Sequence, residues 1–193
     1  THPDYPALKL LETLSTGPGG RFGQRLRSQE KLAYVVLSQF FSFLNGGVFT
    51  TYTAVSPENE KKALRLLIEE YKKLKGSPIE KEELQTTQTY LLGLTLRRLE
   101  SIRSQAHEYA QNEIFGKPVS ATDDFLKHVE AVTLEQINEA ASNYFDLEKY
   151  TLGIIRGIHE TKAIVSTPPK PIIIPKPKSA PKPPTPRPPS VSQ

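Results

Sequence analysis

The sequence predicts an α+β fold in which an antiparallel sheet packs against helices. Two runs rich in β-branched and aromatic residues, 33–43 and 48–55, flank the turn sequence NGG at 45–47 and predict a β-hairpin. Five or six further segments have apolar residues at helical spacing. Only one more strand is expected, at 150–157, and three strands are few for that much helix. We therefore expect the opening strands of the sheet to be missing from this chain.

The region before the hairpin is expected to contain two helices joined by a glycine-rich loop. Residues 6–14 place apolar side chains on one helical face, and residues 24–32 are expected to form a short helix. The loop between them, STGPGGRFG at 15–23, has four glycines and an arginine, a combination that can bind an anion ahead of a helix. It follows a helix rather than a strand and matches neither GxGxxG nor a P-loop, so a flexible connection is the favoured interpretation.

The hairpin is followed by two helices with clear start signals. SPE at 56–58 is typical of a helix start, with a capping serine, a proline in the first turn and an acid near the positive end. This helix is expected to end at Gly76. The next begins at 77–80, where Ser and Glu have capping-box spacing.

The second of these helices is long, and its end is less well defined. Its apolar stripe can reach Phe115 without interruption, or it can break near Ser101 or Ser104. Two shorter helices are expected beyond it, at 121–130 and 134–145.

The chain is expected to consist of one α+β domain, residues 1–165, and a disordered tail rich in proline and lysine, residues 166–193. The tail holds eleven of the 17 prolines, four lysines and one arginine. With those five cations set aside, the domain carries 20 cations and 21 acids, so the basic character of the chain belongs to the tail. A nucleic-acid-binding protein needs a basic surface on its folded part, and this class is not favoured.

The residue types present exclude several kinds of catalytic site. There is no cysteine, which removes thiolate nucleophiles and thiolate metal ligands. The four histidines lie at least 21 residues apart, and neither HExxH nor HxxEH occurs. No GxSxG motif is present, and no apolar run approaches the roughly 20 residues of a membrane helix. We therefore expect no catalytic residue, metal site or cofactor in this chain.

The stretch RSQEKLAY at 27–34 places a cation and a phenol at the junction between the short helix and the first strand. One interpretation is structural: Arg27 would cap helix carbonyls, and Tyr34 would pack with its hydroxyl outward. The other is a pair that binds a peptide. Arginine donates several fixed hydrogen bonds and keeps its charge, and tyrosine offers a directional hydroxyl on a rigid stem. Together they could hold a peptide carbonyl, or an oxyanion that develops on one.

The order of the segments resembles a known protein family. HPDYPALKLLETL is followed by the glycine-rich loop, then by RFGQRLRSQEKLAYVV, GGVFTTYTAVSPENEKKALRLLIEEYKKL, an amphipathic helix, VTLEQINEAASNYF and a closing strand. Over residues 1–157 this pattern is similar to the C-terminal, non-catalytic half-domain of the M16 metallopeptidases, the family of pitrilysin, insulin-degrading enzyme and the mitochondrial processing peptidase.

The resemblance implies a role in peptide cleavage. In this family two homologous α+β halves form a clamshell around a chamber, and the first half binds zinc through an HxxEH motif whose glutamate acts as general base. The second half has no zinc site and contributes an arginine and a tyrosine, seven residues apart, that bind the substrate peptide. These two match Arg27 and Tyr34.

The resemblance also implies what this chain lacks. It would be inactive alone and hold no metal. It would need an HxxEH-bearing half with its zinc, on the same longer chain or on a separate subunit, and its other partners would be peptide substrates. The sequence departs from the family pattern in lacking the opening strands and the catalytic half, in its glycine-rich loop, and in adding the tail.

These departures leave other functions open. One alternative is a non-catalytic M16-like scaffold or partner subunit, although a pure scaffold would not need Arg27 and Tyr34. Another is an adaptor whose PxxP segments in the tail bind an SH3-like groove, for which a flexible linker is the simpler interpretation. Tails of this kind also suit a bacterial envelope, which favours the periplasm or cell envelope over the cytoplasm.

Overall fold

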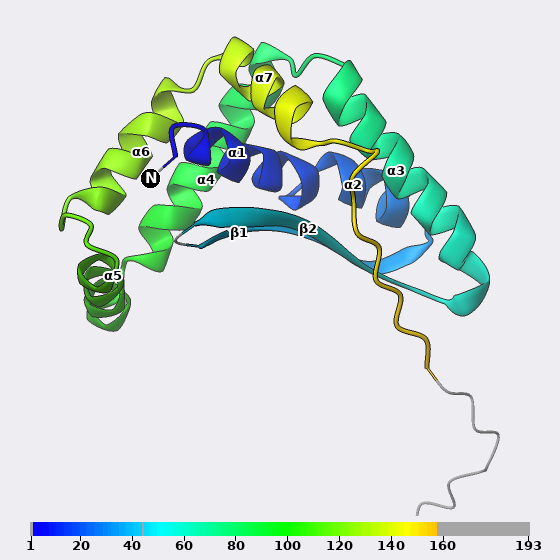
Figure 1. Cartoon of the computed structure of the whole chain (residues 1–193), viewed down its shortest axis with the longest axis horizontal. Helices are drawn as coiled ribbons and strands as arrows, with labels where there is room; N and C mark the ends of the chain where they lie inside the picture. Colours follow the sequence, from blue (N-terminus) through cyan, green and yellow to red (C-terminus); the bar gives the residue numbers. More distant parts are fainter. Residues whose placement is uncertain (1, 44, 158–193) are drawn as a thin grey trace, which may run out of the picture. The chain divides into compact units, whose positions relative to one another are not determined.

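The computed structural model describes residues 2–43 and 45–157. The first compact unit of the chain ends at Arg156 and is the one described below. Within it the fold is α+β, mostly helical with a two-stranded antiparallel sheet, which confirms the predicted fold class (Figure 1). The elements are, in order, α1 (Tyr5–Thr16), α2 (Arg21–Gly23), the π-helical turn η1 (Gln24–Gln29), β1 (Ala33–Phe43), β2 (Gly46–Val55), the 3-10 turn η2 (Pro57–Asn59), α3 (Glu60–Gly76), α4 (Lys81–Arg98), α5 (Ile102–Ile114), α6 (Ala121–Ala131) and α7 (Leu134–Tyr144).

The two strands form the predicted hairpin. They pair antiparallel from the turn as far as Ala33, which lies opposite Val55. Between Ala33 and Val35 the register shifts by one residue, so Tyr34 lies in a β-bulge. A bulge bends the strand locally and re-aims the side chain that it carries.

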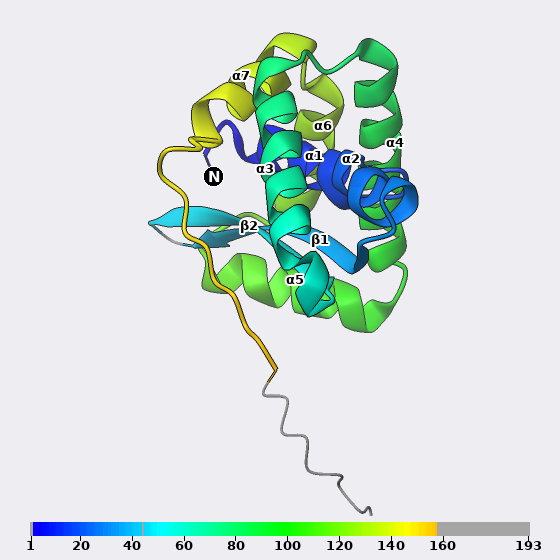
Figure 2. The same ribbon diagram turned by 90° about the vertical axis from the view of Figure 1, so that its right-hand side faces the viewer.

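The helices other than α5 gather over one face of the hairpin (Figures 1 and 2). Val36, Phe40 and Phe49 point into this side and pack against a core to which α1, α4 and α7 contribute buried side chains. The opposite face carries exposed large apolar side chains, namely Val35, Leu37, Phe41, Val48 and Tyr52. The strands therefore alternate between core and solvent, as expected for a sheet covered on one side.

A chain of hydroxyl groups fastens the hairpin to the helices above it. The hydroxyls of Ser38 and Thr51 lie 2.8 Å apart across the two strands, and that of Thr51 lies 2.6 Å from the phenol of Tyr71 in α3. The hydroxyl of Thr16, at the end of α1, accepts a hydrogen bond from the Ser38 backbone N–H at 2.9 Å. Burial raises the pKa of Tyr71, so its hydroxyl remains protonated and can take part in this chain at neutral pH.

The glycine-rich segment forms a tight turn, which corrects the interpretation of a flexible connection. The Gly20 backbone N–H donates to the Gly17 carbonyl at 2.7 Å. A Cβ atom on Gly20 would lie 2.7 to 2.8 Å from backbone atoms of Ser15 and Thr16, which is too close for any side chain. The turn thus depends on the absence of a side chain at Gly20 rather than on freedom of the backbone.

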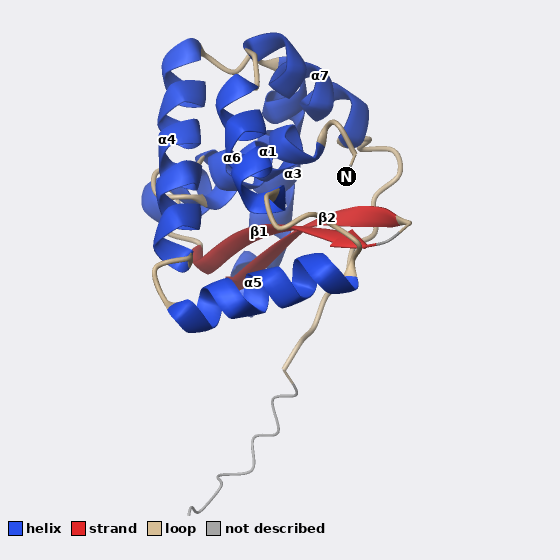
Figure 3. Cartoon of the chain, turned by 90° about the vertical axis from the view of Figure 1, so that its left-hand side faces the viewer, coloured by secondary structure: helices blue, strands red, loops and turns tan. Residues whose placement is uncertain are grey.

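The long helical segment after the second start signal is broken in two. α4 ends at Arg98, and Ser101 starts α5 by accepting a hydrogen bond from the Ser104 backbone N–H at 3.1 Å. The broken alternative is therefore confirmed. In Figure 3, α5 lies below the strands, while the other labelled helices lie above them.

Residues 150–157 do not form the predicted strand. Within the described residues they pair with no other strand, and Leu152 and Ile155 are 48% and 99% exposed. β-branched composition favours a strand only where a neighbouring strand supplies the hydrogen-bond ladder. This segment is held instead by Arg156, which donates two hydrogen bonds to Glu60 in α3, at 2.7 and 2.8 Å.

The remaining predictions divide into confirmed and untested ones. The helices at 6–14, 121–130 and 134–145 are confirmed, with small differences at their ends. The domain boundary after residue 165 and the tail, 166–193, lie outside the described residues and stay predictions. Among the described helices, none has the length and apolar composition needed to cross a membrane.

Candidate functional site

Arg27 lies in an unusual stretch of backbone. It belongs to η1, whose wide turn is closed by the Glu30 backbone N–H donating to the Arg25 carbonyl at 3.1 Å. Lys31 follows with φ of 52°, the one positive value among the described non-glycine residues. A π-helical turn and a left-handed residue are both disfavoured locally, and in proteins they concentrate at functional sites.

A small apolar cluster holds both ends of this connection. Leu26, which precedes Arg27, and Ala33, which precedes Tyr34, are buried in the same cluster. Two buried side chains of α3 form its other side. The structure therefore fixes the two backbone positions to one packed group of residues.

The side chains of Arg27 and Tyr34 themselves are exposed. Tyr34 is 80% exposed, and Arg27 also belongs to the exposed class. In the described part of the chain neither side chain makes an ion pair or a hydrogen bond, so Arg27 does not cap the helix carbonyls. The neighbouring residues Leu26 and Ala33 are packed against α3, while the guanidinium of Arg27 and the hydroxyl of Tyr34 are exposed to a ligand.

Ion pairs join the connection to α3 from two directions. One terminal guanidinium nitrogen of Arg25 lies 3.1 Å from one Glu30 carboxylate oxygen, and Lys62 Nζ lies 2.8 Å from the other. The Arg25 Nε atom faces Glu70, whose nearest oxygen is 3.9 Å away. Glu70 is only 5% exposed, and Lys73 Nζ lies 2.7 Å from its carboxylate. The hydrogen bond from Lys62, followed by the charges of Lys62 and Arg25, holds the pKa of Glu30 below its usual value.

Sequence reasoning missed this group of charges. Arg25 and Glu30 are five residues apart, a spacing that places side chains on different faces of an α-helix. The wider π-turn brings them together. Lys62 and Glu70 come from a helix more than thirty residues later, and no local pattern links them to η1.

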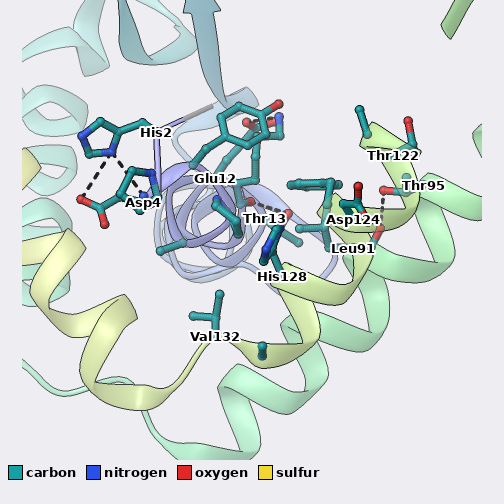
Figure 4. A pocket seen from close by; sticks show the side chains of 18 of the residues that line it. His2, Asp4, Glu12, Thr13, Leu91, Thr95, Thr122, Asp124, His128 and Val132 are labelled. Atoms are coloured by element: carbon teal, nitrogen blue, oxygen red, sulfur yellow. Dashed lines mark hydrogen bonds and ion pairs between the residues drawn. The ribbon is translucent and has the colours of Figure 1, made fainter. Parts of the chain in front are cut away.

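A cavity of about 950 Å³ lies elsewhere, lined by residues of α1, α4, α5 and α6 (Figure 4). Its charged side chains are largely paired, with Lys9 Nζ 2.6 Å from Glu12 and Arg98 2.8 Å from Glu108. Burial, the largest influence, raises the pKa of Glu108, but hydrogen bonds from Thr122 and Arg98 outweigh it and leave that pKa below its usual value. A carboxylate held ionised in this way is poorly suited to donate a proton as a general acid.

Zinc does not fit the described part of the chain. No three His, Cys, Asp or Glu side chains come together there in a group that could hold a metal ion. A catalytic zinc site needs about three protein ligands.

Residues 1–91 match the family model of the peptidase M16 inactive domain. Over these residues, which make up just under half of the chain, the sequence is similar to a peptidase M16 inactive domain. The matched residues run from α1 through the hairpin and α3 into α4, so they include both Arg27 and Tyr34.

Similarity to individual M16 proteins extends further along the chain. It is 26% identical over 151 residues to the uncharacterized zinc protease YmxG of Bacillus subtilis, covering 78% of this chain and 37% of that protein. It is 23% identical over 151 residues to the non-peptidase homolog YmxG of Helicobacter pylori, covering 76% and 34%. The chain thus spans about a third of the length of these relatives.

The solved structures show the same fold. The crystal structure of a peptidase M16 inactive domain from Pseudomonas fluorescens matches with a TM-score of 0.66 at 22% identity, over 75% of this chain and 35% of that one. Within the matched residues, the connection from η1 to β1 is the strongest candidate site, because two exposed polar side chains lie there between backbone positions that are packed against α3.

Proposed function

We propose that this chain is the peptide-binding, zinc-free half of an M16-type zinc endopeptidase. The observation that carries the proposal is the pair Arg27 and Tyr34, exposed on a connection that is packed against α3. A ligand gains most from groups that are held in place before it binds, because less conformational entropy is then lost. This connection meets that condition better than a flexible loop would.

The two side chains have complementary chemistry toward a peptide. The Arg27 guanidinium can donate two parallel hydrogen bonds to a carbonyl or carboxylate, and it keeps its charge at any physiological pH. The Tyr34 hydroxyl can donate one more from a stiff aromatic stem. Neither group can activate water, so the chain binds and orients the substrate while hydrolysis takes place on another domain.

That other domain is an M16 half that carries HxxEH and zinc. The aligned residues of this chain span only about a third of the length of the relatives that it matches. We propose that the two halves enclose a chamber, with Arg27 and Tyr34 facing the peptide inside it. The zinc and the general base belong to the partner half, on the same longer chain or on a separate subunit.

The proposal predicts that Arg27→Ala and Tyr34→Phe each lower peptide cleavage by the enzyme assembled with its HxxEH half. Loss of a charged hydrogen-bond donor should lower kcat/KM by about ten- to a hundredfold, and loss of the neutral hydroxyl by about two- to tenfold. Steady-state cleavage of a quenched fluorescent peptide measures both effects.

Arg103→Ala and Tyr150→Phe are matched controls. Both residues are exposed and lie outside η1 and β1. They should leave the rate unchanged, and circular dichroism should show that all four variants are folded. Wild-type kcat/KM in both Arg27→Ala and Tyr34→Phe would contradict the proposed function.

A second candidate is a non-catalytic partner subunit in an M16-like assembly. One relative is named a non-peptidase homolog, and this name favours a non-catalytic function. The two functions differ in the partner, because a scaffold would assemble with a half that lacks HxxEH. In that case purified complexes would cleave no peptide, and Arg27→Ala would leave assembly intact.

A further inference from the structure

We propose that Arg25 is a positioning residue that holds the turn carrying Arg27 in its peptide-binding geometry, an inference that rests on the proposed function. Arg25 does not contact the peptide in this account. It acts through the backbone of η1, which it ties both to the end of the turn and to α3.

Arg25 holds the end of the turn through both its backbone and its side chain. Glu30 is the residue at which η1 ends, and its backbone N–H closes the wide turn on the Arg25 carbonyl. The Arg25 side chain returns to the same residue, with a guanidinium nitrogen 3.1 Å from the Glu30 carboxylate. The same nitrogen also donates to the Gln29 side-chain oxygen at 3.3 Å. Arg27 lies inside this loop of contacts, so the loop restricts its backbone.

The turn is also attached to α3 by charged side chains. Lys62 holds the other oxygen of Glu30 at 2.8 Å, and Arg25 Nε lies 3.9 Å from Glu70. The Glu70 side chain is 6% exposed, so its charge faces protein rather than solvent. Arg25 and Lys62 thus attach the turn to one rigid helix from two sides.

The Arg25 contacts are not optimal for stability. Its Nε atom is buried and has no hydrogen-bond partner among the described residues. An arginine kept only for stability would be expected to satisfy that donor. Together with the π-turn and the left-handed Lys31, this cluster of locally unfavourable features is typical of a backbone shaped for a ligand.

A double-mutant cycle separates positioning from general stabilisation. The full chain is prepared as wild type, Arg25→Met, Arg27→Ala and the double variant. Affinity is measured by fluorescence anisotropy with fluorescein-labelled casein peptides. We expect Arg25→Met to weaken binding by about tenfold in the wild-type background and by no measurable factor in the Arg27→Ala background. Arg25→Met should have no further effect on affinity in that background, because the Arg27 side chain that Arg25 positions has already been removed.

Arg21→Met is the matched control for loss of an arginine ion pair in the same segment. Arg21 donates two hydrogen bonds to Glu83 in α4, at 2.7 and 2.6 Å, and its side chain is about as exposed as that of Arg25. This variant should lower the melting temperature but leave peptide affinity unchanged. If Arg25→Met does not fold, Lys62→Met tests the same attachment from an exposed position of α3 and should show the same dependence on Arg27.

The outcomes distinguish the two proposals. If Arg27→Ala binds peptide as tightly as wild type, or wild type does not bind, the proposed function fails and the inference with it. If Arg27→Ala weakens binding but the Arg25→Met effect is absent, or is equally large in both backgrounds, only the positioning role is overturned. A similar loss of affinity in Arg21→Met would also overturn it.

Discussion

Glu30 is the residue whose charge ties the end of η1 to α3. Its carboxylate receives Lys62 on one oxygen and Arg25 on the other. This interaction requires the ionised form, and the folded protein accordingly holds the Glu30 pKa below its usual value, mainly through the hydrogen bond from Lys62. The attachment is therefore complete at neutral pH.

The ion pair predicts a definite pH dependence. Because the folded pKa is lowered, the contribution of Glu30 to stability is present above the pKa of the unfolded chain and is lost as pH falls through the lower, folded value. Carboxyl NMR titration should show Glu30 with a midpoint below its ordinary range, and Lys62→Met should raise that midpoint. Equal midpoints in the two proteins would show that Lys62 does not hold Glu30.

At this scale the sequence pointed to some residues of the candidate site and not to others. Arg27 and Tyr34 could be singled out because a family motif and their polar chemistry coincide in one short stretch. Arg25 and Lys62 could not, because their role depends on a π-turn and on a distant helix that meet only in the folded chain.

The glycine-rich turn is the element that sets the direction of α2 and η1. Composition alone suggested a flexible connection, since glycine frequency does not distinguish freedom from close packing. The structure distinguishes them, because the backbone of Thr16 leaves no space at Gly20 and nothing lies within 4 Å of a Cβ on Gly23.

Two alanine substitutions test this difference. Gly20→Ala should destabilise the fold by about 1–3 kcal/mol, because the added methyl group meets backbone that cannot move away cheaply. Gly23→Ala lies in helical backbone with free space and should be neutral or stabilise by up to about 1 kcal/mol. Urea unfolding measures both, and equal effects would contradict the tight-turn description.

The hairpin and most helices were predictable because their signals are local. Turn residues, caps and apolar periodicity lie within a few positions of one another, as in α7, where Thr133 and Gln136 form a capping box. The strand predicted at 150–157 does not form, because its formation depends on a non-local interaction. Its composition is suitable, but strand formation depends on a partner that the described residues do not provide.

At the scale of the described part of the chain, the candidate site and the cavity of about 950 Å³ lie in different places. The cavity between α1, α4 and α6 is the larger hollow, yet its charges are mostly paired with one another. The η1–β1 connection carries two exposed polar side chains, Arg27 and Tyr34, between backbone positions that are packed against α3. Under the proposed function, a second half would complete the enclosure around a peptide bound at this connection.

The most direct test of the central claim is amide hydrogen exchange on the full chain, with and without casein peptides. The account predicts that peptide slows exchange in the segment from Arg25 to Val36 and leaves the helices around the cavity unchanged. Protection confined to α1, α4 and α6, or no protection anywhere at saturating peptide, would contradict the claim that Arg27 and Tyr34 form the peptide-binding site.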